Sequence, residues 1–155
     1  MSALKLVPKT VEEVRAMIEA MPPSERAHLS PDWLAHIYSS SGVDQWTLGY
    51  RLVRVDDGAA VGQCGFKSPP RSGVIEIAYG VAPQFEGRGY ATEAARALVR
   101  IAFESDDVQI VIAHTFERAN ASARVLSKVA FECVGQVADP DDGTVWKWER
   151  KREKA

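Results

Sequence analysis

The spacing of hydrophobic and polar positions predicts two helices in the first quarter of the chain. Apolar residues recur at helical intervals over residues 10–21, which predicts an amphipathic helix. Thr10 and Glu13 form a capping box at its start, in which the hydroxyl and the carboxylate each satisfy a free backbone N–H. A pair of prolines ends this helix, and Ser30 followed by proline predicts a second, short helix through Tyr38.

From residue 46 onward the pattern changes, and strands alternate with helices. Residues 74–82 and 108–114 are apolar runs of strand length, as expected for buried strands, the first of them covered on both faces. Residues 91–104 and 120–129 carry apolar side chains at helical spacing. The other predicted elements are strands at 46–55, 60–67, 131–137 and 144–150, with turns at Asp56-Asp57-Gly58 and Pro140-Asp-Asp-Gly143. This order predicts a single mixed α/β domain over residues 1–155.

Composition narrows the function without naming it. With 19 basic and 21 acidic side chains the net charge is −2, which argues against general binding to nucleic acid or to a membrane surface. The absence of a secretory signal and of a membrane-spanning run predicts a cytoplasmic protein. Cys64 and Cys133 lack metal-ligand spacing and further ligands, so we expect reduced thiols and no metal.

The most informative segment is the glycine-rich stretch between the strand 74–82 and the helix 91–104. Gly87 and Gly89 permit positive φ and a close approach of the backbone to a ligand. The N–H groups from Gly87 to Thr92 would face outward at the positive end of the helix dipole, which suits a pyrophosphate, and Arg88 could add a charge. A plain helix start is the simpler alternative. An ATP-type P-loop is excluded because no Gly-Lys-Ser/Thr follows.

The wider context, Val81-Ala-Pro-Gln-Phe-Glu-Gly-Arg-Gly-Tyr-Ala-Thr-Glu-Ala94, resembles motif A of the GNAT superfamily of N-acetyltransferases, closest to its RimJ/RimL-type members. In that family the turn cradles the pyrophosphate of coenzyme A. The family pattern is Gln or Arg, two residues, Gly, one residue, then Gly or Ala, and it fits from Gln84 or from Glu86. We prefer the second register because the helix then opens as in RimJ/RimL-like sequences. It places a carboxylate, Glu86, where the family has Gln or Arg.

Residues 112–131 resemble the family's next motif, a strand followed by Asn-x-Ser-x-x-Val-Leu-x-Lys-x-Gly-Phe. Asn120, Ser122 and Lys128 match this pattern, whereas Ala130 stands where glycine is usual. Local physics offers another interpretation, in which Asn120 or Ser122 is a helix cap and Lys128 a cation in the last turn. The two motifs occur in the family's order, and the resemblance covers roughly residues 45–150.

The resemblance implies the GNAT fold and acetyl-CoA as cosubstrate. That fold is a mixed, mostly antiparallel sheet of six to seven strands, flanked by about four helices, with splayed central parallel strands. The pantetheine arm would lie in the gap between these strands and pair with the backbone of Tyr79, Gly80 and Val81. The other residues expected to hold the cofactor are Gly87, Arg88, Gly89, Tyr90, Ala91 and Thr92 in the turn, followed by Asn120 and Lys128.

Acetyl transfer to an amine requires a base, a donor to the oxyanion and a proton for the leaving thiolate. The resemblance implies direct transfer without an acyl-enzyme, so neither cysteine is needed. Glu76 is the candidate base, because it is a lone carboxylate in an apolar strand and removal from water makes a carboxylate more basic. Alternatively it binds a neighbour or positions the substrate. Ser122 is the candidate proton donor to sulfur, and a backbone N–H near Gly80 or Val81 suits the oxyanion.

The sequence therefore predicts an acetyl-CoA-dependent N-acetyltransferase that acts on a primary amine, either a protein N-terminus or a small molecule. We expect a monomer or a homodimer, with the acceptor site between residues 10–38 and the loop at Pro69-Pro70. The alternative is a catalytically silent acyl-CoA-binding sensor or interaction module, which the departures at Glu86 and Ala130 leave open. A nucleotide-dependent oxidoreductase is disfavoured because no acidic residue ends the strand at His114.

Overall fold

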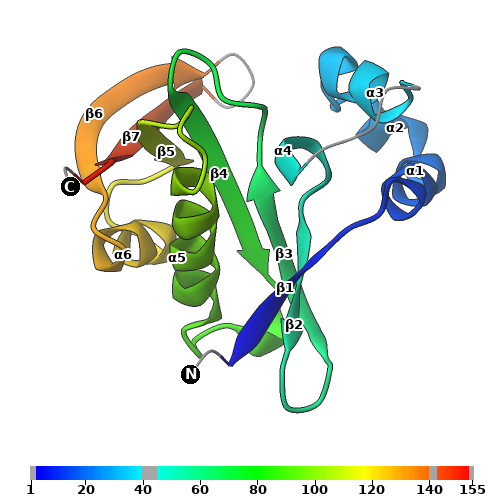
Figure 1. The fold of residues 1–155 in the computed structure, drawn as a ribbon, viewed down its shortest axis with the longest axis horizontal. Coiled ribbons are helices and arrows are strands. Elements are labelled where there is room, and N and C mark those ends of the chain that lie inside the picture. Colours follow the sequence, from blue (N-terminus) through cyan, green and yellow to red (C-terminus); the bar gives the residue numbers. More distant parts are fainter. Residues whose placement is uncertain (1–2, 40–44, 140–142, 154–155) are drawn as a thin grey trace.

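A computed structural model describes residues 3–39, 45–139 and 143–153 of the chain. No helix in these ranges is long and apolar enough to span a bilayer. The elements, shown in Figure 1, are in chain order β1 (Leu4–Pro8), α1 (Val11–Ala20), α2 (Pro23–Arg26), α3 (Pro31–Ile37), α4 (Gln45–Leu48), β2 (Tyr50–Arg54), β3 (Ala60–Phe66), β4 (Val74–Val81), a 3₁₀ turn (Pro83–Phe85), α5 (Tyr90–Phe103), β5 (Ile110–Thr115), α6 (Ala121–Lys128), β6 (Glu132–Asp139) and β7 (Gly143–Lys151).

The strands form one seven-stranded mixed sheet in the order β1-β2-β3-β4-β5-β7-β6. All neighbours are antiparallel except the central pair β4 and β5. This parallel pairing is confined to Val74–Glu76 of β4 opposite Ile110–Ile112 of β5, and the two strands then diverge. The structure thus confirms the mixed, mostly antiparallel sheet with splayed parallel strands.

One face of the sheet carries the main hydrophobic core and is covered by α5 and α6 (Figure 1). Ile75 and Ile77 of β4 point toward α5, whose Ala94, Leu98 and Ala102 are fully buried. Because side chains alternate along a strand, the intervening residues of β4 point to the opposite face, which we call the open face. The core therefore fixes which side chains of β4 reach each side of the sheet.

The N-terminal helices form a second, smaller core of their own around Val14, Ile18 and Ile37. The predicted capping box is confirmed, because Thr10 Oγ1 accepts from Glu13 N at 3.1 Å and Glu13 Oε1 accepts from Thr10 N at 3.3 Å. The predicted helix after Ser30 is confirmed as α3. Both helix starts could be predicted because each capping side chain bonds a backbone N–H only three residues away.

Several sequence predictions are wrong in detail. Residues 46–48 form the helical turn α4 rather than the start of a strand. Trp46 packs edge-on against Phe66 at 5.0 Å, and Trp33 Nε1 donates to Thr47 O at 3.0 Å, so contacts from distant residues override the strand pattern. The strand β1 and the short helix α2 were not predicted. Of the six helices in the described residues, α2 and α4 are only four residues long. The predicted turn at residues 140–142 lies outside the described residues.

The strand β4 is buried on one face only, which also corrects the prediction. Ile75 and Ile77 are buried, whereas Ala78 and Gly80 are exposed. The strand β5 likewise alternates between buried and half-buried residues. An unbroken apolar run was expected of strands covered on both sides. In β4 it instead leaves the small residues Ala78 and Gly80 exposed on the open face.

Candidate functional site

The turn before α5 leaves backbone donors free at a helix start. Gly87 and Gly89 have φ of 77° and 81°, and Gly89 is the N-cap without any side-chain cap. A Cβ built on either glycine would meet nothing within 4 Å, so the space in front of the turn is open. The first backbone N–H to bond back within the helix is that of Glu93, to Gly89 O at 3.1 Å. The N–H groups from Gly89 to Thr92 therefore lack intrahelical partners and can bind an anion.

Phe85 anchors this turn between two cations. The guanidinium of Arg54 lies 5.1 Å from the ring centre and that of Arg88 5.9 Å. A hydrogen bond from Arg54 to the Asp57 carboxylate raises the pKa of Arg54, which keeps this contact charged. The guanidinium of Arg88, which the sequence predicts to contact the ligand, lies over the Phe85 ring. Glu86 is exposed, and among the described residues it makes no ion pair with Arg88.

The end of β4 offers a free backbone edge to the gap. Lys67 N donates to Glu76 O, and Ala82 N donates to Val61 O, so the even-numbered residues of β4 direct their backbone groups toward β3. The N–H and C=O of Tyr79 and Val81 consequently face the opening left by β5. Of the two backbone N–H groups considered as oxyanion donors, that of Val81 faces the opening, whereas that of Gly80 is turned to β3.

A cleft of about 530 Å³ joins this edge to the glycine turn. It lies between β4, α5 and α6, so that segments far apart in the sequence form its walls. Its lining comprises Tyr79, Gly80, Val81, Phe85, Glu86, Gly87, Gly89, Tyr90, Ala91, Thr92, Ala121, Ser122, Arg124, Val125 and Lys128. Most of the predicted site residues are thus brought together. Glu76, Arg88 and Asn120 do not line the cleft.

The start of α6 distinguishes the roles of Asn120 and Ser122. Asn120 is the N-cap, with Oδ1 accepting from Ala123 N at 2.9 Å. The cap interpretation therefore holds for Asn120, and Ser122 is exposed on the cleft wall. Across the gap, the hydroxyl of Tyr79 donates to Ser122 O at 3.4 Å. Burial raises the pKa of Tyr79 to about 12, so the phenol remains protonated at neutral pH.

Glu76 is not the isolated carboxylate that the sequence suggested. Its Oε2 lies 2.9 Å from Nδ1 of His114 and 3.0 Å from Nζ of Lys67. These partners come from β5 and from the end of β3, so sequence spacing along β4 could not reveal them. His114 of β5 is half-buried and hydrogen-bonded on the open face. Glu76 Oε1 has no partner recorded among the described residues.

Two further cavities lie between the sheet and the N-terminal helices. One, of about 610 Å³, is bordered by α1 and contains Lys9, Glu13 and Arg51. The other, of about 360 Å³, is bordered by α3 and α4. Both contain Gln63 and Gly80, and Gly80 also lines the cleft on the other side of the sheet. The position of Gly80 is therefore where spaces on the two sides of the sheet meet.

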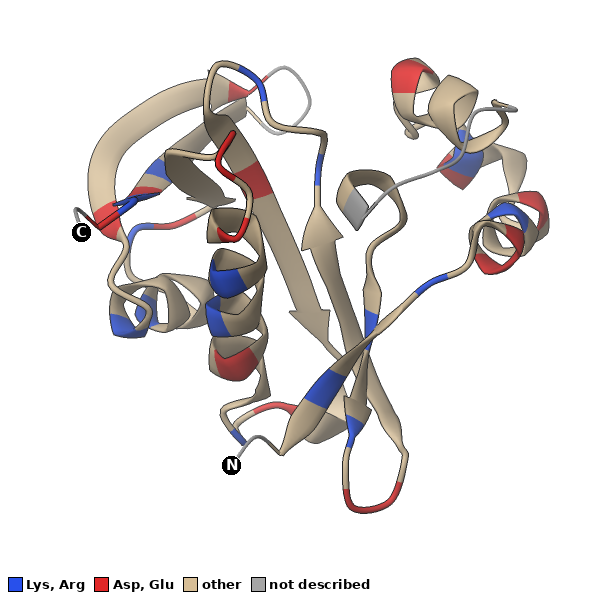
Figure 2. Cartoon of the chain, viewed as in Figure 1, with Lys and Arg blue, Asp and Glu red and all other residues tan. Residues whose placement is uncertain are grey.

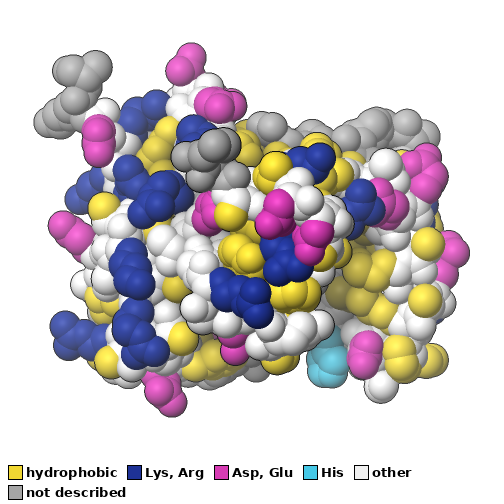
Figure 3. Space-filling view, turned by 90° about the horizontal axis from the view of Figure 1, so that it is seen from below, with side chains coloured by type: hydrophobic (Ala, Val, Ile, Leu, Met, Phe, Trp, Pro, Cys, Tyr) yellow, Lys and Arg dark blue, Asp and Glu magenta, His cyan; other side chains and the backbone are white. Residues whose placement is uncertain are grey.

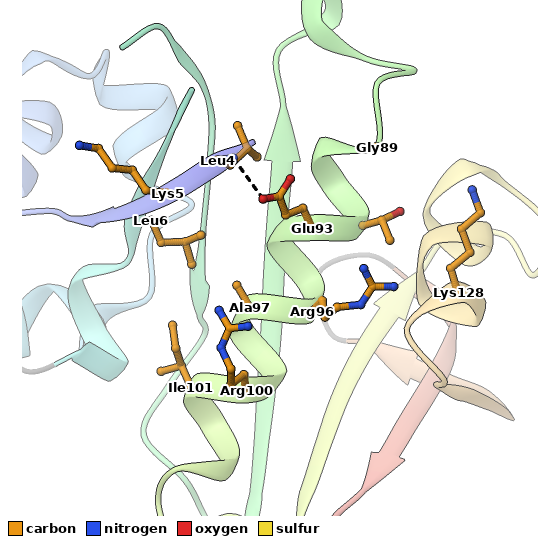
Figure 4. Close-up of a pocket in the computed structure, with 11 residues that line it drawn as sticks. Leu4, Lys5, Leu6, Gly89, Glu93, Arg96, Ala97, Arg100, Ile101 and Lys128 are labelled. Atoms are coloured by element: carbon orange, nitrogen blue, oxygen red, sulfur yellow. Dashed lines mark hydrogen bonds between the residues drawn. The ribbon is translucent and has the colours of Figure 1, made fainter. Parts of the chain in front are cut away.

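A basic groove of about 740 Å³ adjoins the phosphate end of the cleft, between β1 and α5 (Figure 4). It shares Gly89, Thr92 and Lys128 with the cleft. Arg96 and Arg100 project from successive turns of α5, while the ammonium of Lys5 points away on the far side of β1 (Figure 4). Lys and Arg residues mark the exposed faces of α5 and α6 (Figure 2), and Figure 3 shows such side chains gathered over this half of the molecule.

Such a frame, a mixed sheet with a splayed parallel pair and a glycine turn at a helix start, defines an acyltransferase of the GNAT type. Residues 4–132 match the family model described as an acetyltransferase (GNAT) domain. The chain belongs to this family. Among the described residues, no group of three or more His, Cys, Asp or Glu side chains is placed to hold a metal ion.

Solved structures with the same fold are dissimilar in sequence. The chain is similar to AAC(6')-Ib in complex with paromomycin and acetyl-CoA, with a TM-score of 0.69 and 19% identity over 97% of this chain and 94% of that one. It is similar to RimL, a ribosomal protein N-acetyltransferase in complex with coenzyme A, with a TM-score of 0.70 and 16% identity over 97% and 95%. It is also similar to a spermidine N-acetyltransferase chimera that combines Vibrio cholerae SpeG with hSSAT. The TM-score is 0.71 and the identity 14%, over 97% of this chain and 96% of that one. These likenesses establish the fold.

Proposed function

We propose that residues 1–155 form one acetyl-CoA-dependent N-acetyltransferase domain that transfers the acetyl group directly to a primary amine. The observation that carries this proposal is the cleft that joins the free edge of Tyr79 and Val81 to the unpartnered N–H groups at the start of α5. An extended arm fits beside the free strand edge, while a pyrophosphate fits the turn. Two of the solved structures, those of AAC(6')-Ib and RimL, contain acetyl-CoA or coenzyme A, which supports the same ligand here.

The cations beside the turn suit the anionic end of this ligand. Lys128 stands between the cleft and the basic groove, and Arg96 and Arg100 continue the positive charge along α5. Within the described residues none of these three forms an ion pair. Unpaired cations attract phosphate groups at long range and bind them at short range. We therefore expect the backbone N–H groups to bind the pyrophosphate and these three cations to strengthen that binding.

In the proposed reaction the amine nitrogen attacks the thioester carbonyl. The N–C bond forms, the C–S bond breaks, the amine loses a proton, and the coenzyme thiolate gains one. The Val81 N–H faces the gap and is placed to stabilise the oxyanion. Ser122 lines the cleft, and the protonated Tyr79 phenol lies beside it, so either hydroxyl can protonate the sulfur.

Glu76 would receive the amine proton through water rather than directly. Gly80 lies four positions further along β4, which corresponds to roughly 13 Å along a strand. The carboxylate is held by Lys67 and His114, and its Oε1 stays available to a water molecule. These contacts also support the alternative in which Glu76 positions its neighbours, so the two roles need separate measurement.

The test is a calorimetric titration of the purified protein with acetyl-CoA, with coenzyme A and NADH as comparison ligands. We expect micromolar binding of acetyl-CoA and none of NADH. A Gly89→Val variant should abolish binding because a side chain at positive φ distorts the turn, while Gly143→Val, at the same kind of φ in β7, should not. Thiol release in the presence of amines then reports transfer. Binding without release for any amine would instead identify a sensor.

A further inference from the structure

The two cavities between the sheet and the N-terminal helices carry too few carboxylates to bind an acceptor with several positive charges. We call them together the acceptor groove: the cavity beneath α1, lined by Lys9, Glu13 and Arg51, and the cavity beneath α3 and α4. The charged side chains in the described lining are these three, two cations and one carboxylate. An amine with several positive charges binds through unpaired carboxylates. The acceptor groove offers a net positive charge instead.

The single carboxylate of the acceptor groove is already occupied. Glu13 Oε1 accepts from Thr10 N in the capping box, and Glu13 Oε2 forms an ion pair with Arg51. Both oxygens are thus engaged in holding α1 and β2 in place. Recruiting Glu13 to bind a cationic ligand would break the cap, the ion pair or both, which opposes that use.

Lys9 is the cation of this groove that a ligand can reach. Its Nζ donates to Gln63 Oε1 at 2.5 Å, a neutral partner, and no carboxylate among the described residues forms an ion pair with it. The side chain is half-buried, and burial lowers the pKa of Lys9, with smaller opposing effects from Cys64 and Glu13. A bound anion would offset this loss of solvation.

Lys9 lies near the part of β4 where the acetyl group and the amine are proposed to meet. Gln63, to which it donates, pairs with Gly80 across the β3–β4 ladder. Residues opposite each other in such a ladder lie about 5 Å apart. Lys9, Gln63 and Gly80 also line the same cavity, so a carboxylate bound by Lys9 would lie near an amine placed at Gly80. Apolar side chains complete the groove and suit an uncharged side chain, among them Val14, Met17, Trp33 and Leu48.

We propose that the acceptor is a small amine that carries a carboxylate close to the amine, such as a free amino acid with an apolar side chain, and that Lys9 binds this carboxylate. This inference rests on the proposed acetyltransferase function and narrows it to one class of acceptor. It separates this chain from the relatives bound to paromomycin or named for spermidine, whose amines carry several positive charges.

The experiment compares leucine, leucine methyl ester, spermidine and kanamycin as acceptors, by thiol release with saturating acetyl-CoA. Binding of each amine to the protein loaded with coenzyme A is measured in parallel by calorimetry. We expect kcat/KM for leucine to exceed that for its ester and for both polycations by about ten- to a hundredfold, the worth of one charge-assisted hydrogen bond. The amine of the ester is less basic than that of leucine and is more often deprotonated. Without the contact to Lys9, the ester would therefore react faster than leucine.

Two variants assign the effect to its residue. Lys9→Met should bring the leucine-to-ester ratio close to one, mainly by loss with leucine. Lys151→Met removes the same charge at the exposed far end of β7 and should leave the ratio unchanged. A higher kcat/KM for spermidine or kanamycin than for leucine would overturn the inference. So would an unchanged ratio in Lys9→Met, or no binding of leucine to the loaded protein. Failure of acetyl-CoA itself to bind would refute the proposed function instead.

Discussion

The contact between β3 and β4 gives the sharpest test of the cleft. A Cβ built on Gly62 would lie 2.1 Å from Gly80 O, 3.0 Å from Val81 Cα and 3.1 Å from Gly80 C. Carbon and oxygen atoms pack at about 3.3 Å or more, so Gly62→Ala must push the end of β4 aside by about 1 Å. The atoms that move are those proposed to bind the pantetheine arm and the oxyanion.

The expected magnitudes follow from this displacement. Overpacking of this size costs about 1–3 kcal/mol, which lowers the melting temperature by roughly 3–10 °C for a chain of this length. A shift of about 1 Å at a reacting centre reduces turnover by about a hundredfold. We therefore expect Gly62→Ala to fold, to bind acetyl-CoA at least about tenfold more weakly, and to lose most of its rate of thiol release.

Gly58→Ala is the matched control. Gly58 has φ of 72° in the β2–β3 turn, and a Cβ there meets nothing within 4 Å. The variant loses about 1 kcal/mol through its backbone conformation while β4 stays in place. Thermal unfolding, calorimetry with acetyl-CoA and thiol release are measured on both variants. If Gly62→Ala is folded and keeps the wild-type affinity and rate within twofold, β4 does not hold the cosubstrate and the reasoning fails.

Three further predictions concern single side chains. Ala130 holds φ of 65° after α6, so Ala130→Gly should raise the free energy of unfolding by about 0.5–1 kcal/mol in urea titrations; a loss of stability would show that its methyl group matters more than its backbone. Glu76→Gln should reduce thiol release by about tenfold or more while acetyl-CoA affinity stays within twofold, and unchanged turnover would remove Glu76 from the mechanism. Burial raises the pKa of Tyr79 from its usual 10 to about 12, so its stabilising contribution is complete below pH 10 and is lost as the pH rises through 12. Urea titrations at pH 9 and 11.5 should show a smaller alkaline loss of stability in Tyr79→Phe, and an equal loss would contradict the buried phenol.

The parts of the fold that depend on near neighbours in sequence were predictable. The capping box at Thr10 and Glu13 and the glycines of the turn before α5 act within a few residues, so the pattern contains their whole cause. The departure at Ala130 was also visible in the sequence. Its physical meaning emerges from the structure, because the position takes the left-handed conformation that glycine adopts without cost.

Features built by distant residues escaped prediction. The helical turn at Trp46 depends on Phe66 and Trp33, which come from other elements. The environment of Glu76 depends on Lys67 and His114, which reach it across two different neighbouring strands. The strand β1 is only five residues long and pairs at the sheet edge, so its pattern is too short to identify. In each case the deciding contact is tertiary.

The small second core around Val14, Ile18 and Ile37 has a consequence for how such an enzyme diversifies. The helices α1 and α3 pack on one another around this core, while α5, α6 and the strands that form the cleft share the larger core. Substitutions within α1 and α3 can therefore accumulate without disturbing the glycine turn, whereas a substitution in the strands beneath them, as at Gly62, also displaces β4. An evolving lineage can exchange one acceptor for another while its acetyl donor stays the same, because the two recognition tasks are supported by separate sets of packed side chains.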